Sequence, residues 1–363
     1  HPSGCFVRAA LVALVCDLPA ARLLGGFAHY GSSANPCSIC KISHLNNLDP
    51  NLFTPRTNME HRRMAKEWLA AGSEAERDAL YHRNGVRWSE LLRLDYWDPV
   101  QNTVVDPMHG FYLRVLQRHC RDIWGMSVEL TDCDGLWEIP MPNEEEKARA
   151  MYLFRHGNKS VLGRLTLAEI RADMDKTKKP SFIPSAPSKP GEAAQGKFTA
   201  DQWRTFSTIH LPITLIRLWG LKPGTRKYKM LVNFMHLITA VRLANMRAMT
   251  ADRVEQFEYH IRAYLEDLIG FGSSDPMEGL YPHTRISPYQ HMMLHFGDLL
   301  RRFGPVHSWR CFAFERLNYI LQSFPTNSRF GMSSVVCSCC LPHLPVQENW
   351  SRQCSSGSVC RKD

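Results

Sequence analysis

A helical repeat in the second half of the chain places the strongest limit on the fold. Between Ala251 and Ile269, apolar residues recur at steps of three and four, as in an amphipathic helix: Val254, Phe257, Ile261, Leu265 and Leu268. Thr250 precedes this segment as a helix cap, and Gly270 follows it as a stop signal. Further helices are predicted over residues 59–71, 74–82, 111–124, 144–155, 166–174, 200–219, 227–249, 288–303 and 308–323. The pattern predicts a mostly α fold.

An apolar run near the start of the chain is the best candidate for a buried strand. Residues 7–16 read VRAALVALVC and are followed at once by Asp17. The core of a secretory signal is the alternative, but no Lys/Arg-rich leader precedes the run and no small-residue cleavage site follows it. We therefore expect a central strand and, with it, a partial α/β core. A second short strand is predicted over residues 103–105.

The charge balance favours a polyanionic partner. The 363 residues carry a formal net charge of +9, and 44% of them are hydrophobic, which is typical of a globular chain. Because many proteins without a nucleic-acid partner are equally basic, this excess alone is weak support. No apolar run approaches the length that spans a bilayer, so no membrane partner is expected. The sequence also has no P-loop, dinucleotide-binding glycines or GxSxG elbow.

A proline-rich basic segment interrupts the helices at residues 176–197. It contains four prolines and five lysines but one glutamate, which predicts an extended, flexible and exposed linker. Lys176, Lys178 and Lys179 at its start are candidates for contacts with the phosphate backbone of DNA. A solvated loop without a ligand explains these three lysines equally well.

Two carboxylates stand where metal ligands would be expected. Asp17 ends the apolar run, and strand ends are where α/β proteins place residues of their sites. A helix cap is the alternative, and the residues alone favour it, because Leu-Pro follows Asp17 as a good helix start. Glu315 lies in an aromatic stretch, so we expect a partly enclosed acid that is paired, protonated or metal-bound. An ion pair with Arg310 or Arg316 is the simpler explanation of Glu315.

Cys37 and Cys40 form a CxxC pair that indicates a zinc site. Two thiolates at this spacing converge on one tetrahedral ion and leave two positions for other ligands. His109, in the sequence Asp106-Pro-Met-His, and His44 are the candidates for these positions. An ordinary buried thiol pair explains the CxxC equally well.

Other histidines and cysteines carry weaker signals. His291 and His295 are four residues apart on a predicted helix and can share a ligand, but they lack the glutamate of a zinc-protease motif, so we expect them to pack. Near the end of the chain, Cys337, Cys339 and Cys340, with His343, match no common zinc spacing. The uneven distribution of the cysteines favours a reducing compartment.

Taken in order, these segments resemble one family. The ordered set consists of VCDLPAAR (residues 15–22), GGF (25–27), CSIC (37–40), YWDP (96–99), VVDPMH (104–109), DQWRT (201–205), FGPVHSW (303–309) and FERLN (314–318). The set is similar to the transposase domain of CACTA (En/Spm-like, tnp2-type) DNA transposons as they occur in mushroom-forming basidiomycete fungi. Each motif alone is weak, but the order over residues 3–331 is specific.

The resemblance implies an RNase H-like core with a large helical insertion between the second aspartate and the final glutamate. Asp17 would be that aspartate and Glu315 that glutamate, in a DDE triad that binds two Mg²⁺ or Mn²⁺ ions to cut and join DNA. Further signatures of the family, implied to form a metal site or a brace, are matched by Cys37, Cys40, Asp106 and His109. The implied partner is DNA, the implied compartment is the nucleus, and the active form is implied to be a homo-oligomer.

Four regions are predicted on this basis. Residues 1–36 would form a partial RNase H-like core, 37–285 the helical insertion, 286–331 the C-terminal catalytic helix region, and 332–363 a divergent or disordered Cys-rich tail. The first aspartate of the family lies upstream of the apolar run, so we expect an inactive fragment of a transposase. The alternative is a non-catalytic, transposase-derived protein that binds DNA or another protein, and a secreted Cys-rich protein ranks third.

Overall fold

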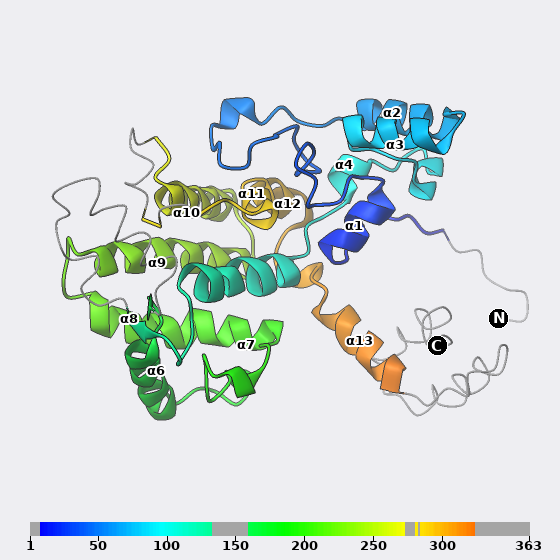
Figure 1. Ribbon diagram of the computed structural model, residues 1–363. Coiled ribbons are helices and arrows are strands. Elements are labelled where there is room, and N and C mark those ends of the chain that lie inside the picture. The colour runs from blue at the N-terminus through cyan, green and yellow to red at the C-terminus, as the bar shows by residue number, and fades with distance from the viewer. Residues whose placement is uncertain (1–7, 133–158, 273–279, 282–283, 324–363) are drawn as a thin grey trace, which may run out of the picture. The chain divides into compact units, whose positions relative to one another are not determined.

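Helices dominate the part of the chain that the structure describes. A computed structural model (Figure 1) describes residues 8–132, 159–272, 280–281 and 284–323. Residues 1–309 form one unit and residues 310–363 a second. The prediction of a mostly α fold is confirmed, and the helix predicted over residues 144–155 lies outside the described residues.

The helices of the first unit differ widely in length. In chain order they are α1 (Leu18–Gly25), α2 (Asn58–Ala70), α3 (Glu74–Asn84), α4 (Pro99–Asn102), α6 (Arg164–Lys176), α7 (Ala200–Thr205), α8 (Leu211–Trp219), α9 (Arg226–Ala244), α10 (Ala251–Ile269), α11 (Pro288–Met293) and α12 (Phe296–Phe303). Between them lie the π-helical segments η3 (Met108–Leu116), η4 (His119–Ile123) and η6 (Phe206–His210), and the 3-10 turns η1 (Pro50–Leu52), η2 (Glu90–Arg93), η5 (Ala193–Gln195) and η7 (Val306–Ser308). In the second unit, α13 spans Phe312–Ser323.

Helices α9 and α10 form a hairpin that supplies much of the core (Figure 1). The Asn233 amide of α9 donates to the Tyr264 carbonyl of α10 at 2.9 Å. Thr250 caps α10 as predicted, and Gly270 ends it with a left-handed φ of 65°. The five apolar residues predicted for the inner face of α10 are all at most 1% exposed. Burial of each such side chain contributes roughly 1.5–3 kcal/mol of transfer free energy.

A buried cluster of rings connects this hairpin to η4. The imidazole of His119 lies 4.4 Å from the Trp124 ring and 5.3 Å from the Phe234 ring, measured between ring centres. Burial lowers the pKa of His119 to about 3, so the imidazole is neutral in the folded protein. The helix predicted over residues 111–124 is present in largely π-helical form, and Gly125 ends it with a φ of 60°.

The apolar run is not a buried strand. Among the described residues it makes one isolated parallel bridge, between Leu14 and Thr103, and Leu11 and Val12 are 37% and 66% exposed. The one longer ladder in the described ranges pairs β1 (Thr131–Asp132) with β2 (Lys159–Ser160). A central strand needs neighbours that satisfy its backbone on both sides, and the described residues offer the run no such sheet. The prediction of a central strand is therefore wrong, and the described residues show no RNase H-like sheet core.

The segment predicted as an exposed linker packs partly against α6. Pro187 and Pro190 are buried, and the Pro190 carbonyl accepts a hydrogen bond from Arg171 at 3.0 Å. Arg171 also pairs with Glu192 at 3.1 Å. Because proline has no N–H to satisfy, it enters such a contact without losing a hydrogen bond. The second half of the segment is thus not the extended, exposed chain that its composition predicts.

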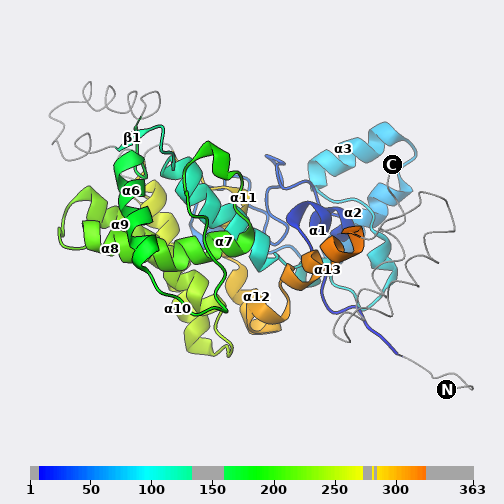
Figure 2. The same cartoon turned by 90° about the horizontal axis from the view of Figure 1, so that it is seen from below.

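Several predicted helices have different limits in the structure. The predicted helix 288–303 is divided at Leu294 and His295 into α11 and α12, and the last predicted helix begins later, at Phe312. Helices α2 and α3 match their predictions closely and pack against one another, as both views show (Figure 2). No helix in the described ranges has the length and apolar character needed to cross a membrane. The region boundaries at residues 36, 285 and 331 stay predictions.

Candidate metal centre

Four metal-binding side chains from two distant segments meet in the first unit. One ligand atom from each lies within 4.8 Å of all the others: Cys37, Cys40, His291 and His295. The Cys40 Sγ atom is 3.3 Å from His291 Nε2, which is in turn 3.2 Å from His295 Nε2. Cys37, Cys40 and His291 are buried, and His295 is half-buried. This group can hold a metal ion such as zinc.

A tight turn prepares the two cysteines for a shared ligand. The Cys37 sulfur accepts backbone N–H groups from Ile39 at 3.3 Å and from Cys40 at 3.4 Å. The turn is tied to the following segment, because Lys41 N–H donates to the Thr54 carbonyl and Arg56 N–H to the Ile39 carbonyl. N–H groups directed at sulfur stabilise the thiolate form that a metal requires.

Helix α11 and the turn that follows it present the histidines to the cysteine turn. Ser287 and Gln290 form a capping box at the start of α11, and Pro288 stands at its first position, which pre-organises the helix start. His291 lies in α11, and His295 follows in the turn between α11 and α12, with its Nε2 atom 3.2 Å from that of His291. Phe53 packs on both imidazoles, at 5.2 Å and 5.6 Å between ring centres. The expectation that these two histidines merely pack therefore missed their main neighbours, the two cysteines.

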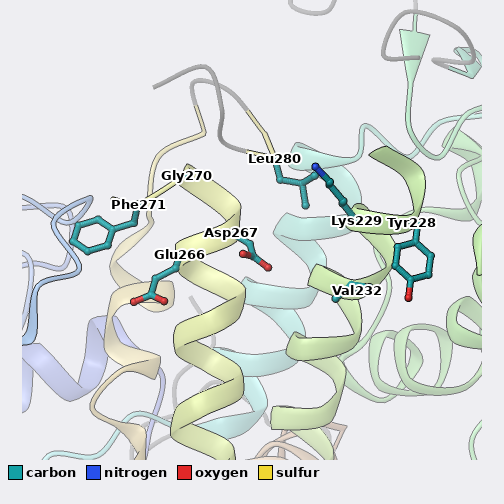
Figure 3. Close-up of a pocket in the computed structure, with 8 residues that line it drawn as sticks. All are labelled: Tyr228, Lys229, Val232, Glu266, Asp267, Gly270, Phe271 and Leu280. Carbon is teal, nitrogen blue, oxygen red and sulfur yellow. The ribbon is translucent and has the colours of Figure 1, made fainter. Parts of the chain in front are cut away.

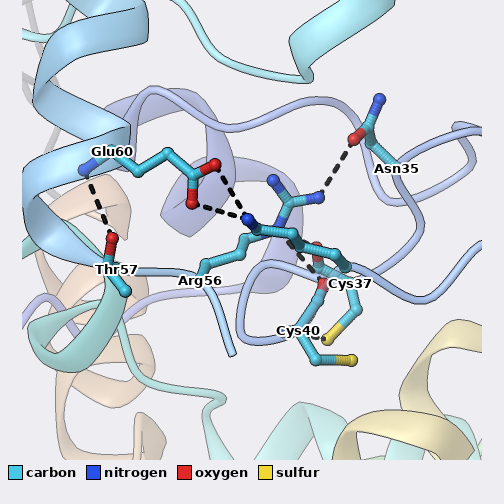
Figure 4. Close-up of polar contacts among 7 residues, drawn as sticks. Asn35, Cys37, Cys40, Arg56, Thr57 and Glu60 are labelled. Atoms are coloured by element: carbon cyan, nitrogen blue, oxygen red, sulfur yellow. Dashed lines mark hydrogen bonds and ion pairs between the residues drawn. The ribbon is translucent and has the colours of Figure 1, made fainter. Parts of the chain in front are cut away.

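Two arginines surround the cysteine turn. Arg56 donates to the carbonyls of Cys37 at 3.0 Å and Cys40 at 3.2 Å, and to the Asn35 side chain at 3.0 Å (Figure 4). Arg22 is 1% exposed and donates to the Ala28 and Pro36 carbonyls. Burial lowers the pKa of Arg22 to about 10, while Cys37 opposes this shift. Two cations thus stand beside the thiols and favour their ionised form.

The two thiols differ in their acidity. Burial disfavours the Cys37 thiolate, but hydrogen bonds with Cys40, His291 and His295 outweigh burial and hold the pKa of Cys37 well below its usual value. The bond to Cys37 and burial together raise the pKa of Cys40. A metal ion binds cysteine as thiolate, so binding here would displace whatever protons the two thiols hold.

The donor set and its spacing suit a tetrahedral ion. A tetrahedral zinc with bonds of about 2.0 Å to nitrogen and 2.3 Å to sulfur separates its ligand atoms by about 3.3–3.8 Å. Two of the separations, 3.2 Å and 3.3 Å, lie close to this range, and all ligand atoms lie within 4.8 Å of one another. Soft sulfur with imidazole nitrogen favours zinc over magnesium or calcium, which prefer oxygen.

His109 and His44 do not join this group. His109 lies with Asp106, whose Oδ2 atom accepts the His109 backbone N–H at 2.8 Å and lies 2.7 Å from His109 Nδ1. Asp106 is 2% exposed, so its carboxylate is a buried acceptor at the start of η3. His44 is exposed. The Asp-x-x-His spacing at a helix start explains why Asp106 and His109 form a close pair. The predicted partnership of His109 with Cys37 and Cys40 is not observed.

Asp17 acts as the cap of α1. Its side chain accepts the Ala20 N–H at 2.8 Å, and the residue is exposed. The alternative that the sequence favours for Asp17 is thus observed. The parallel bridge pairs Leu14 with Thr103, and Asp17 and Asp106 both stand three residues further along. Burial raises the pKa of Cys16 to about 11, with contributions from Asp17 and Asp106, so both carboxylates lie near Cys16.

Three of the four remaining predicted site residues are exposed. Glu315 is in the first turn of α13, in the second unit, and is exposed rather than partly enclosed. Lys176 and Lys178 are exposed. Lys179 is half-buried and donates to the Ile183 carbonyl at 2.8 Å and the Ser185 hydroxyl at 3.1 Å, so it braces its own loop.

A pocket of about 600 Å³ lies elsewhere, between the start of α9 and the end of α10 (Figure 3). Its charged lining side chains are Lys229, Glu266 and Asp267, and Phe271 lies at its edge. None of the predicted site residues contributes to this pocket.

Comparisons with known proteins add no family. No family model matches this sequence, and no curated protein matches it. The fold and the site define a mostly helical protein with a largely buried Cys₂His₂ group that can bind a metal ion.

Proposed function

We propose that Cys37, Cys40, His291 and His295 bind one structural Zn²⁺ ion. The observation that carries this proposal is the convergence of four ligand atoms within 4.8 Å of one another. Four protein ligands fill a tetrahedral zinc, so no position remains for a water molecule or a substrate. The ion would link the Cys37–Cys40 turn to α11 and would stabilise the fold without taking part in a reaction.

Zinc content tests this proposal directly. We expect one zinc per chain in the purified protein, and we expect Cys40→Ser and His291→Gln to retain little. Cys16→Ser is the matched control, because Cys16 is a half-buried cysteine outside the group. Zinc retention by Cys40→Ser and His291→Gln at the level of Cys16→Ser would overturn the proposal.

We further propose that the chain belongs to a DDE-type DNA transposase of the CACTA kind. The ordered motifs from residue 15 to residue 318 support this proposal. In it, Asp17 and Glu315 bind Mg²⁺ or Mn²⁺, while the zinc site, the Asp106–His109 pair and the helical body form the scaffold. The net charge of +9 suits DNA as the partner, and the nucleus would be the compartment. The active form would be a homo-oligomer.

The transposase proposal is tested by divalent-metal-dependent DNA cleavage in the full-length protein. Asp17→Asn and Glu315→Gln should each abolish cleavage while leaving the zinc content unchanged, since neither residue belongs to the Cys₂His₂ group. Cleavage that persists in both variants would overturn the catalytic assignment.

A non-catalytic DNA-binding protein derived from a transposase is the second candidate. The use of the Asp17 side chain as a helix cap favours it, because capping alone explains that residue. This candidate predicts salt-dependent DNA binding that survives the combined change of Asp17→Ala and Glu315→Ala, with no cleavage in any variant.

A further inference from the structure

A continuous row of aromatic and cationic side chains crosses the first unit near α1. It is called the ring row here and consists of Arg114, Tyr289, Tyr30, His29, Tyr81, His82 and Arg87. At one end the Arg114 guanidinium lies 5.4 Å from the centre of the Tyr289 ring. Tyr289 meets Tyr30 edge-on at 5.9 Å, and Tyr30 lies 4.3 Å from His29.

The row continues through α3 to a second arginine. The His29 backbone N–H donates to the Tyr81 hydroxyl at 3.1 Å, which links the two segments. The Tyr81 ring lies 5.9 Å from the His82 ring, and the Arg87 guanidinium lies 5.9 Å from the Tyr81 ring. The row therefore joins side chains from distant parts of the sequence and has an arginine at each end.

The exposure of these side chains distinguishes the ring row from a core cluster. His29, His82 and Arg114 are exposed, Tyr30, Tyr81 and Arg87 are half-buried, and Tyr289 is 4% exposed. By contrast, His119 and Trp124 in the core cluster are both fully buried. Tyr289 thus anchors the row, while its other members are exposed or half-buried.

The charge of the row suits an anionic partner. Among the described residues, Arg87 and Arg114 form no ion pair with a carboxylate: Arg87 donates to the Leu23 carbonyl at 3.4 Å, and Arg114 lies on Tyr289. Their charges are therefore not neutralised within this part of the chain. Burial raises the pKa of Tyr289, Arg114 opposes the shift, and Asp17 adds to it, so Asp17 is a neighbour of the row.

We propose that the ring row binds a single-stranded segment of nucleic acid. Unpaired bases would stack on the accessible faces of Tyr30, His29 and Tyr81, and Arg87 and Arg114 would contact phosphates. Aromatic rings combined with cations are the physical basis of single-strand binding, because every base has a stacking face and every nucleotide a charge. A duplex hides its base faces, so the row should prefer unpaired DNA.

This inference deepens the proposed DNA function and rests on it. It states that the DNA strand bound beside Asp17 is unpaired, whereas the transposase proposal alone requires only that DNA is bound. The zinc proposal does not depend on it, since no member of the ring row belongs to the Cys₂His₂ group.

Fluorescence anisotropy of the whole chain with a labelled oligothymidylate of about 20 nucleotides provides the test. A duplex of equal length is measured in parallel, each at several salt concentrations. The variants are Tyr30→Leu, Tyr30→Trp and Arg114→Gln. Tyr259→Leu is the matched control, because Tyr259 is 62% exposed and lies on α10, outside the row. Zinc content and circular dichroism show that each variant keeps its fold.

We expect the single strand to bind more tightly than the duplex. Tyr30→Leu and Arg114→Gln should each weaken single-strand binding about five- to tenfold, while Tyr30→Trp and Tyr259→Leu keep it. Equal affinity for both DNA forms, with no effect of the two row variants, would overturn the ring-row inference and leave the DNA proposal standing. If the unaltered chain binds neither form, the inference and the proposed DNA function both fail.

Discussion

The Sγ atom of Cys40 lies 3.3 Å from the Nε2 atom of His291, although the two residues are 251 positions apart in the chain. A metal ion held between them would close a very long loop. Closing a loop restricts the unfolded chain, and the effect grows slowly with loop length. Metal binding at this point is therefore coupled to folding.

Removal of zinc should destabilise the protein. Compared with protein in free zinc at about a thousand times the dissociation constant, zinc-free protein should have a free energy of unfolding lower by about 4 kcal/mol. Urea unfolding followed by circular dichroism, with and without a strong chelator, measures this difference. Cys16→Ser should respond to the chelator as the unaltered protein does, and an unchanged urea midpoint in both would contradict a stabilising metal.

Arg56→Gln should weaken zinc binding about tenfold or more, because the lost guanidinium orients the Cys37–Cys40 turn through its carbonyls. Arg63→Gln is the control, since Arg63 pairs with Glu67 at the surface. Competition against a zinc-binding dye gives both affinities. Equal affinities would show that the turn holds its shape without Arg56.

Acid should destabilise the fold through His61. Burial, aided by Arg56, lowers the pKa of His61 from 6.5 to about 4. The unfolded chain therefore takes up the proton first, so the contribution of His61 is complete above pH 6.5 and is lost as the pH falls toward 4. The shift corresponds to about 3 kcal/mol.

His61→Leu should reduce the loss of stability between pH 7 and 4, because leucine has no group that takes up a proton. Leucine also keeps the packing against the Phe27 ring, whose centre lies 4.5 Å from that of His61. Urea midpoints between pH 4 and 7, measured on chelated protein so that zinc release does not contribute, test this expectation. A profile in His61→Leu as steep as in the unaltered protein would assign the acid sensitivity to another group.

Asp17 variants separate the helix cap from metal binding. Asp17→Ala should cost about 1 kcal/mol of stability through loss of the bond to Ala20, while Asp17→Asn keeps the cap. If Asp17 also binds a catalytic metal, both variants lose DNA cleavage in the full-length protein. Cleavage by Asp17→Asn alone would show that Asp17 is a cap and nothing more.

Lys178 and Lys179 of the basic segment should behave differently in DNA binding. Lys178 is exposed, so Lys178→Ala should reduce the salt dependence of affinity by about one phosphate contact. Lys179 donates to its own loop, so Lys179→Ala should leave the salt slope unchanged. The slope of log affinity against log salt concentration distinguishes the two variants. A smaller slope in Lys179→Ala, with no change in Lys178→Ala, would show that Lys179 rather than Lys178 contacts phosphate.

Local signals account for the parts of the fold that the sequence predicts well. Thr250 and Gly270 define α10 to the residue, because caps and left-handed glycines act within one helical turn. Asp17 as a cap follows from the same rule. The buried strand fails because an apolar run becomes a strand only where other strands receive it, and that depends on distant residues.

The metal group could be predicted only in part. The CxxC spacing identifies Cys37 and Cys40, and the one-turn spacing of His291 and His295 marks a pair that can share a ligand. Nothing local joins the two pairs, because the tertiary fold alone brings α11 to the cysteine turn. His109 is closer in sequence, but Asp106 holds it at the start of η3.

X-ray absorption at the zinc edge of the purified protein tests the central claim most directly. A Cys₂His₂ centre predicts two sulfur ligands at about 2.3 Å and two nitrogen ligands at about 2.0 Å. His295→Gln should lose one nitrogen ligand or release the ion. A shell of nitrogen and oxygen without sulfur, or a protein that holds no zinc, would contradict a metal centre built from Cys37, Cys40, His291 and His295.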